Sequence, residues 1–164
     1  MDAALLIVRL IIGLALAAHG AQKLFGWFGG HGLKGTGEAF GSMGWRPGPL
    51  FALMAGLGEF GGGLLTAIGL LNPIGPALVI VVMLNAIFAV HWKNGFFAMA
   101  NGVELPLMNA AGALAIAFAG PGAYSLDAWI NFGALSDPGT KWIVIGAAVI
   151  VAVLNLLARR PAPA

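Results

Sequence analysis

The stretch AALLIVRLIIGLALAAHGAQKLF, at residues 3–25, decides the fold class of this chain. A helix needs about 20 apolar residues to cross the roughly 30 Å hydrocarbon core of a bilayer, and this run is long enough. A secretory signal peptide carries positive charge ahead of its apolar run, whereas here Asp2 precedes the run and Arg9 lies inside it. We therefore expect residues 3–25 to form a transmembrane helix that is retained in the protein.

Further apolar segments of similar character follow the first. They lie at residues 50–71, 74–92, 104–119 and 141–158. Asn72-Pro73 leaves almost no loop between the second and third segments, so these two are expected to form an antiparallel hairpin. A short interfacial helix is expected at residues 36–43. The sequence thus predicts an all-α fold: a transmembrane helical bundle with a four-helix core and an extra C-terminal transmembrane helix.

The composition supports a membrane protein and excludes several other classes. Hydrophobic residues make up 60% of the 164 residues and charged residues only 9%, whereas a soluble domain carries about 25% charged residues. The net charge is +2 and the basic residues are scattered, so the clustered charge of a nucleic-acid binder is missing. The chain has no cysteine, which excludes disulfides, thiol nucleophiles and iron–sulfur sites.

The positions of the basic residues predict the orientation of the bundle. With five transmembrane helices the two termini lie on opposite sides of the membrane. A cytoplasmic C-terminus places six basic residues inside and leaves Lys141 at the opposite boundary, as the positive-inside rule favours. The six are Lys23, Lys34, Arg46, Lys93, Arg159 and Arg160. We expect the N-terminus outside and the C-terminus in the cytoplasm.

Ionisable residues inside the apolar segments are candidates for function, because charge is costly in hydrocarbon. His19 and Lys23 share one face of the first segment, which must point into the bundle. Glu59 lies near the middle of the second segment and needs either a cation or a proton. His91 ends the third segment. We expect these four side chains to converge in the cytoplasmic half of the membrane, together with Glu104 at the start of the fourth segment.

Other polar and aromatic residues are expected to have structural roles. Arg9 shares the polar face of the first helix and, like Lys23, is a candidate partner of Glu59. Glu104 and Asn85 are expected to be structural, and asparagines such as Asn85 and Asn109 are expected to bond across helices. The five tryptophans are expected to anchor the helices at the membrane surface. They are Trp27, Trp45, Trp92, Trp129 and Trp142.

Several ligand chemistries can be weighed against these residues. Two histidines on different helices are able to ligate haem, but no second pair supports that reading. A metal bound by His19, His91 and Glu59 has suitable ligand types, but Lys23 one turn from His19 repels a cation. A quinone-like ligand fits better, because its carbonyls accept hydrogen bonds from His19, Lys23 and His91. Glu59 is then the candidate catalytic residue, which relays a proton when the ligand is reduced.

Several short motifs carry a resemblance to a known family. They are HGAQKLF at 19–25, GLGEFGGG at 56–63, IGL at 68–70, His91 followed by NGFF at 94–97, ELPL at 104–107 and GPGAYSLD at 120–127. In this order the chain resembles the DoxX family of small bacterial membrane proteins over residues 5–127. The family's polar positions correspond to His19, Lys23, Glu59 and His91.

The resemblance implies a four-helix bundle in the bacterial inner membrane. It further implies a membrane subunit of a redox system, linked in some relatives to thiosulfate:quinone oxidoreduction and in others to oxidative or thiol stress. Residues 1–127 would then form the DoxX-like bundle, and residues 128–164 a loop, the fifth transmembrane helix and a short cytoplasmic tail. The expected partners are membrane lipids and a soluble oxidoreductase or sulfurtransferase, and a homo-oligomer is compatible with the sequence.

The cofactor is left open, with quinone favoured over haem or metal. The alternative to a redox subunit is a non-enzymatic membrane scaffold or a small-solute carrier. The carrier has less support, because the sequence shows no pair of half-helices in inverted repeats.

Overall fold

The computed structural model describes residues 1–160 and is helical in all of its regular elements. The elements are α1 (Asp2–Phe25), η1 (Trp27–Gly29), α2 (Gly32–Ser42), α3 (Gly48–Ile68), α4 (Ile74–Ala86), the π-helical turn η2 (Ile87–His91), η3 (Trp92–Asn94), η4 (Ala98–Ala100), α5 (Glu104–Ala119), α6 (Leu126–Trp129) and α7 (Pro138–Leu157). The all-α prediction is confirmed. The expected cytoplasmic tail ends in residues 161–164, which lie outside the described residues.

The helix boundaries follow from glycine and proline. α1 ends at Gly26 (φ 73°) and α3 at Gly69 (φ 66°), both in the left-handed conformation that glycine adopts readily. α3 begins directly after Pro47, with a second proline in its first turn. The short helix expected at residues 36–43 is longer than predicted, since α2 spans Gly32–Ser42.

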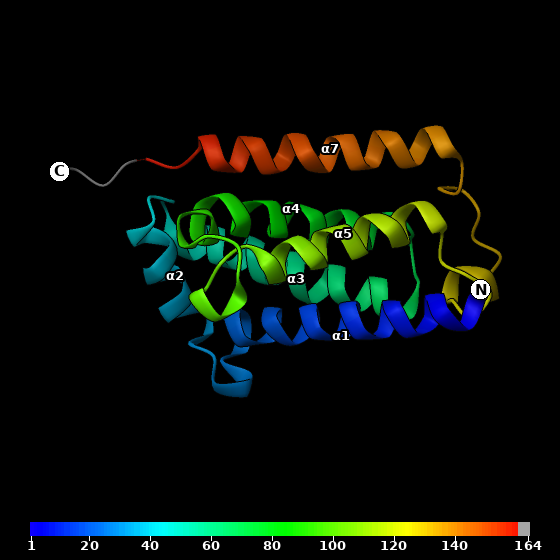
Figure 1. The fold of residues 1–164 in the computed structure, drawn as a ribbon, viewed down its shortest axis with the longest axis horizontal. Helices are drawn as coiled ribbons and strands as arrows, with labels where there is room; N and C mark the ends of the chain where they lie inside the picture. Colours follow the sequence, from blue (N-terminus) through cyan, green and yellow to red (C-terminus); the bar gives the residue numbers. More distant parts are fainter. Residues whose placement is uncertain (161–164) are drawn as a thin grey trace.

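The long helices run side by side along the longest axis of the molecule (Figure 1). α1, α3, α4, α5 and α7 alternate in direction, so the start of α1 and the end of α7 lie at opposite ends of the bundle, and α2 lies at the end where α7 finishes. Within residues 1–160, four helical segments are long and apolar enough to cross a membrane: Asp2–Phe25, Gly48–Ile68, Ile74–Asn94 and Pro138–Leu157. The fourth predicted span, α5, is shorter at 16 residues.

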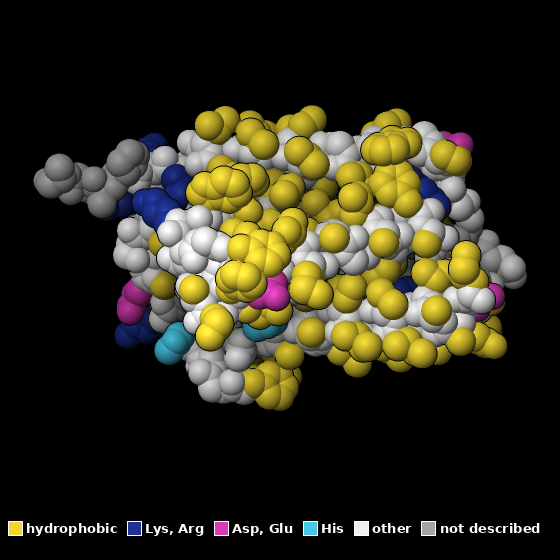
Figure 2. All heavy atoms as spheres, viewed as in Figure 1, with side chains coloured by type: hydrophobic (Ala, Val, Ile, Leu, Met, Phe, Trp, Pro, Cys, Tyr) yellow, Lys and Arg dark blue, Asp and Glu magenta, His cyan; other side chains and the backbone are white. Residues whose placement is uncertain are grey.

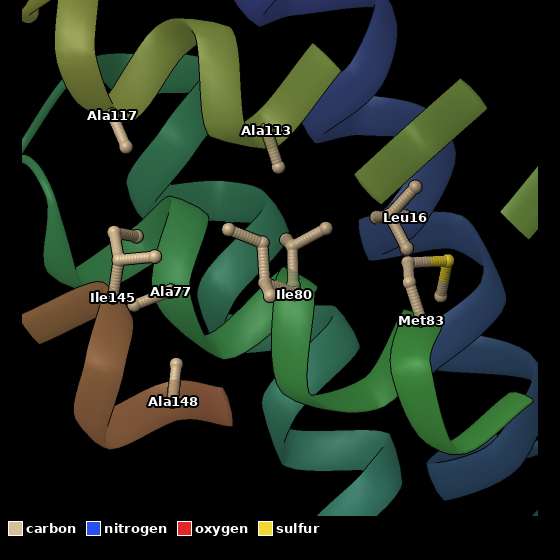
Figure 3. Close-up of a cluster of buried hydrophobic side chains, with 9 residues drawn as sticks. Leu16, Ala77, Ile80, Met83, Ala113, Ala117, Ile145 and Ala148 are labelled. Carbon is tan, nitrogen blue, oxygen red and sulfur yellow. The ribbon is translucent and has the colours of Figure 1, made fainter. Parts of the chain in front are cut away.

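The core lies between α1, α4, α5 and α7 (Figure 3). Leu16 of α1 faces Met83 of α4, while small side chains of α5 and α7 approach α4 from two sides. Alanines at these contacts let the helix backbones come close, as helix packing in lipid requires. They are Ala77, Ala113, Ala117 and Ala148.

Glycines bring α1 and α3 into direct backbone contact. A Cβ atom on Gly13 would lie 2.6 Å from the carbonyl oxygen of Gly63, and one on Gly63 would lie 2.6 Å from the oxygen of Gly13. Two turns further along α1, Gly20 meets the backbone of Gly56 and Phe60 in the same way. This contact sets the distance between the polar residues at the end of α1 and the middle of α3.

The outer surface is apolar along the length of the bundle (Figure 2). Large hydrophobic side chains such as Ile11, Leu57 and Ile150 are exposed in the isolated chain, which a bilayer would cover. Most of the Lys and Arg side chains visible in Figure 2 gather at the end where α2 lies. The chain is therefore a multi-pass membrane protein in contact with lipid.

Candidate functional site

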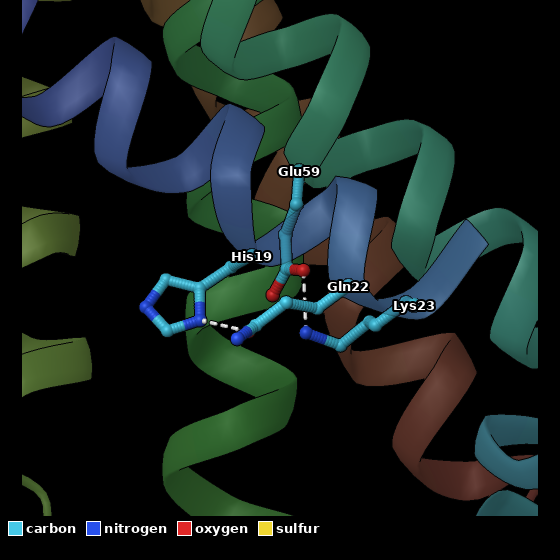
Figure 4. Close-up of polar contacts among 4 residues, drawn as sticks. All are labelled: His19, Gln22, Lys23 and Glu59. Carbon is cyan, nitrogen blue, oxygen red and sulfur yellow. Dashed lines mark hydrogen bonds and ion pairs between the residues drawn. The ribbon is translucent and has the colours of Figure 1, made fainter. Parts of the chain in front are cut away.

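An ion pair between α1 and α3 forms the centre of the site (Figure 4). Lys23 Nζ donates a hydrogen bond to Glu59 Oε2 at 2.5 Å. The Glu59 side chain is 5% exposed and that of Lys23 is 25% exposed. The pair gives the buried carboxylate in the middle of α3 both a hydrogen-bond donor and an opposite charge. It also identifies Lys23, rather than Arg9, as the partner of Glu59, which the sequence left open.

His19 lies beside this pair, one turn before Lys23 on α1 (Figure 4). Its Nδ1 is 3.2 Å from Gln22 Oε1. The Gln22 amide nitrogen in turn donates to the carbonyl oxygen of Phe28 at 3.2 Å. These bonds fasten the end of α1 to the segment that follows it and hold the imidazole next to the ion pair.

A cavity of about 560 Å³, here called the main cavity, opens beside the ion pair. His19, Lys23, Glu59 and His91 all line it, together with Asn85. The rest of the wall is mostly apolar and comes from every long helix. It includes Leu16, Phe40, Phe51, Met54, Leu78, Val82, Met83, Val90, Leu105 and Val151. The structure thus brings the four predicted ligand-binding residues around one space.

A π-helical turn places His91 at this cavity. α4 passes into the π-helical turn Ile87–His91, and such turns often occur at functional sites. His91 Nδ1 lies 2.8 Å from the carbonyl oxygen of Asn101, in the loop before α5. Glu104 contacts the same loop, where its Oε2 accepts from the backbone N–H of Ala98 at 2.8 Å. Glu104 therefore holds the loop, rather than joining the four residues around the cavity.

Trp45 is a cavity residue that the sequence analysis missed. It was expected to be a membrane-surface anchor, but this prediction is wrong because Trp45 is 3% exposed and lines the main cavity. Its Nε1 donates to the carbonyl oxygen of Asn155 at 2.9 Å, and the guanidinium of Arg159 lies 4.9 Å from the centre of its ring. The other four tryptophans are exposed. No pattern in the sequence separates Trp45 from them.

Asparagines from three helices also line the main cavity: Asn85 of α4, Asn109 of α5 and Asn155 of α7. The expected cross-helix bond of Asn85 is not formed, because its amide nitrogen donates to Val81, one turn earlier on the same helix, at 2.8 Å. Its Oδ1 is buried and has no hydrogen-bond partner among residues 1–160. Asn85 therefore offers a free acceptor at the cavity wall, and Asn155 was not anticipated.

Arg9 belongs to a separate network at the opposite end of the bundle. It is 1% exposed, and its Nη2 donates to the carbonyl oxygen of Tyr124 at 2.7 Å. Nearby, the carboxylate of Asp127 accepts from the backbone N–H groups of Leu71 and Asn72 at 2.8 and 2.9 Å. Arg9 thus ties α1 to the segment before α6, and Asp127 ties the α3–α4 turn to α6 itself. No pattern in the sequence predicted this network.

Within residues 1–160, no group of three His, Asp or Glu side chains is arranged to hold a metal ion. The polar groups around the main cavity are one carboxylate, one ammonium, two imidazoles and the side-chain amides of four asparagines. Such a wall, mostly apolar with a few convergent polar groups, is typical of a small-molecule site.

Fold and site together define a multi-pass helical membrane protein with a polar cluster between its helices. The family model for DoxX matches residues 4–92, more than half of the chain, and the protein belongs to the DoxX family. The matched region contains all four predicted ligand-binding residues, whereas the motifs at 94–127 lie beyond it. Neither curated proteins nor solved structures gave a match.

Proposed function

We propose that this protein is the membrane subunit of a redox system and binds a quinone-like ligand in the main cavity. The observation that carries the proposal is the Lys23–Glu59 ion pair, which lies at the wall of an otherwise apolar cavity. A quinone has a flat, weakly polar head on a long apolar tail. The volume of about 560 Å³ falls within the range of roughly 300–1,000 Å³ that small-molecule sites occupy.

The polar side chains match what a quinone head requires. His19, Lys23 and His91 supply donors for its carbonyl oxygens. The free Oδ1 of Asn85 supplies an acceptor for the hydroxyl group that forms on reduction. Phe40 and Trp45, whose ring centroids are 5.1 Å apart, offer flat apolar surfaces against which a ring is able to pack.

The proposed reaction is the two-electron reduction of the quinone to a hydroquinone. The electrons come from a soluble partner, either the reduced flavin of an oxidoreductase or a sulfur compound such as thiosulfate, which is oxidised. Each carbonyl oxygen takes one proton and becomes a hydroxyl group. Glu59 is the proposed catalytic residue, because a buried carboxylate paired with an ammonium is able to accept and pass on a proton.

The proposal also includes the orientation of the protein in the membrane and the residues that form the family's bundle. The end that carries α2 faces the cytoplasm of a bacterium, as the positive-inside rule favours. Residues 1–127 would form the family's bundle, and α7 would add to it. A soluble electron donor would then approach the end of the bundle nearest the polar cluster.

Binding of a short-chain ubiquinone or menaquinone analogue to the purified protein in nanodiscs tests the proposal. Glu59→Gln and His19→Ala should each weaken binding about tenfold, since one lost hydrogen bond is worth about 1 kcal/mol or more. Glu38→Gln is the matched control, because Glu38 is exposed on α2. No binding by the wild type, or equal binding by all variants, would overturn the proposal and favour the scaffold alternative.

A further inference from the structure

A second, smaller cavity lies on the other side of the ion pair. It has a volume of about 300 Å³, and we call it the vestibule. Its lining consists of glycine, alanine and polar or charged side chains, in contrast to the apolar main cavity. The lining residues are Gln22, Lys23, Gly29, Gly30, His31, Gly35, Thr36 and Ala39.

The two cavities share one side chain and are joined by two polar links. Lys23 lines both of them, and its ammonium is bonded to Glu59 of the main cavity. Gln22 lines the vestibule, and its side chain is bonded to His19, which lines the main cavity. The wall between the cavities is thus the last part of α1, and hydrogen-bonded pairs cross it at two places.

Glycines hold the vestibule in this position. A Cβ atom on Gly30 would collide with the backbone of Gln22, and one on Gly35 would lie 2.8 Å from the Cβ of His31. The Gly30 contact, which only glycine allows, brings the segment between α1 and α2 onto the end of α1. The Gly35 contact lies within the start of α2. The glycine-rich segment after α1 thereby forms an open hollow that Lys23 lines.

We infer that the vestibule is the aqueous route by which protons reach the main cavity, with Lys23 as the connecting group. The inference rests on the proposed function, in which each reduced quinone takes up two protons. Lys23 gives a proton to Glu59, to which it is hydrogen-bonded, and Glu59 passes a proton to the reduced oxygen. The amine of Lys23 then regains a proton from water in the vestibule. Besides Lys23, the titratable side chain of the vestibule lining is His31.

Thr36→Leu tests the route by filling the vestibule with apolar atoms, and Ser42→Leu is the matched control. Ser42 lies on the same helix, is exposed, and lines neither cavity. Quinone-loaded protein in nanodiscs is mixed with excess reduced flavin mononucleotide, and the loss of quinone absorbance is followed in H2O and D2O. Thr36→Leu should slow reduction about tenfold or more and raise the solvent isotope effect, while quinone affinity stays unchanged. Ser42→Leu should match the wild type.

A second measurement needs no quinone. The chain has no native cysteine, so Lys23→Cys carries a single thiol. A charged, bilayer-impermeant methanethiosulfonate should label this thiol about tenfold more slowly when Thr36→Leu is added, because thiol reactivity follows access. Ser42→Leu should leave the labelling rate unchanged.

The outcomes separate the two proposals. Normal quinone affinity with unchanged reduction and labelling in Thr36→Leu overturns the vestibule route and leaves the quinone site standing. If the wild type binds no quinone, the proposed function fails. The labelling rates then decide by themselves whether water reaches Lys23 through the vestibule.

Discussion

The Lys23–Glu59 ion pair should be asymmetric in its effect on stability. Lys23→Met leaves the Glu59 carboxylate, which is 5% exposed, without its cation. Removing one partner of a buried pair costs about 3–5 kcal/mol. Glu59→Gln instead leaves the ammonium of Lys23, which is 25% exposed and lines the vestibule. Water is able to solvate that group, so we expect this variant to lose only about 1–2 kcal/mol.

The double variant Lys23→Met/Glu59→Gln should be more stable than Lys23→Met alone, because it leaves no buried charge. Unfolding of each variant in mixed micelles with increasing dodecyl sulfate, followed by helical circular dichroism, gives the free energies. The expected coupling is about 2–3 kcal/mol. Two outcomes would refute this reasoning. One is an equal loss of unfolding free energy in the two single variants. The other is a loss in the double variant that equals the sum of the single losses to within about 0.5 kcal/mol.

Three further predictions concern the rest of the fold. Gly63→Leu should force α1 and α3 apart and cost at least about 1–3 kcal/mol, whereas Gly61→Ala, which meets open space, should be neutral in the same unfolding assay. Trp45→Phe removes the hydrogen bond to α7 and should cost about 1 kcal/mol, while removing most of the tryptophan quenching that a bound quinone causes. Asp127→Asn should cost about 1–3 kcal/mol, because it weakens the acceptor of two buried backbone N–H groups, and should leave quinone affinity unchanged.

Each of these predictions has an outcome that contradicts it. A wild-type unfolding curve for Gly63→Leu in dodecyl sulfate would mean that the α1–α3 contact is loose. Full fluorescence quenching in Trp45→Phe would place the quinone elsewhere. A large loss of quinone affinity in Asp127→Asn would show that the two ends of the bundle are coupled, against the separation of Arg9 and Asp127 from the main cavity.

The sequence predicts the bundle and its polar centre because both follow from the free energy of placing apolar and charged side chains in lipid. Long apolar runs must span lipid, and a carboxylate such as Glu59 must find a partner there. The choice of Lys23 over Arg9 as that partner depends on which turn of α1 meets α3, and the glycine contacts decide this in three dimensions. The burial of Trp45 depends on α7 returning to the loop after α2, a long-range contact that local patterning does not encode. The π-helical turn at His91 likewise comes from tertiary packing.

The order in which the cavity walls appear along the chain has a consequence for biogenesis. Glu59 and Lys23 lie in the first two long helices, so they are able to pair and neutralise each other soon after these helices leave the ribosome. The main cavity, however, also draws on Asn109 of α5 and on Val151 and Asn155 of α7. Hydrogen bonds from Arg159 and Arg160 then fasten the end of α7 to Met43 and Gly44 beside Trp45. The proposed ligand site is therefore complete only when α7 has been inserted, and a nascent chain that stalls before α7 has an assembled ion pair but an open cavity.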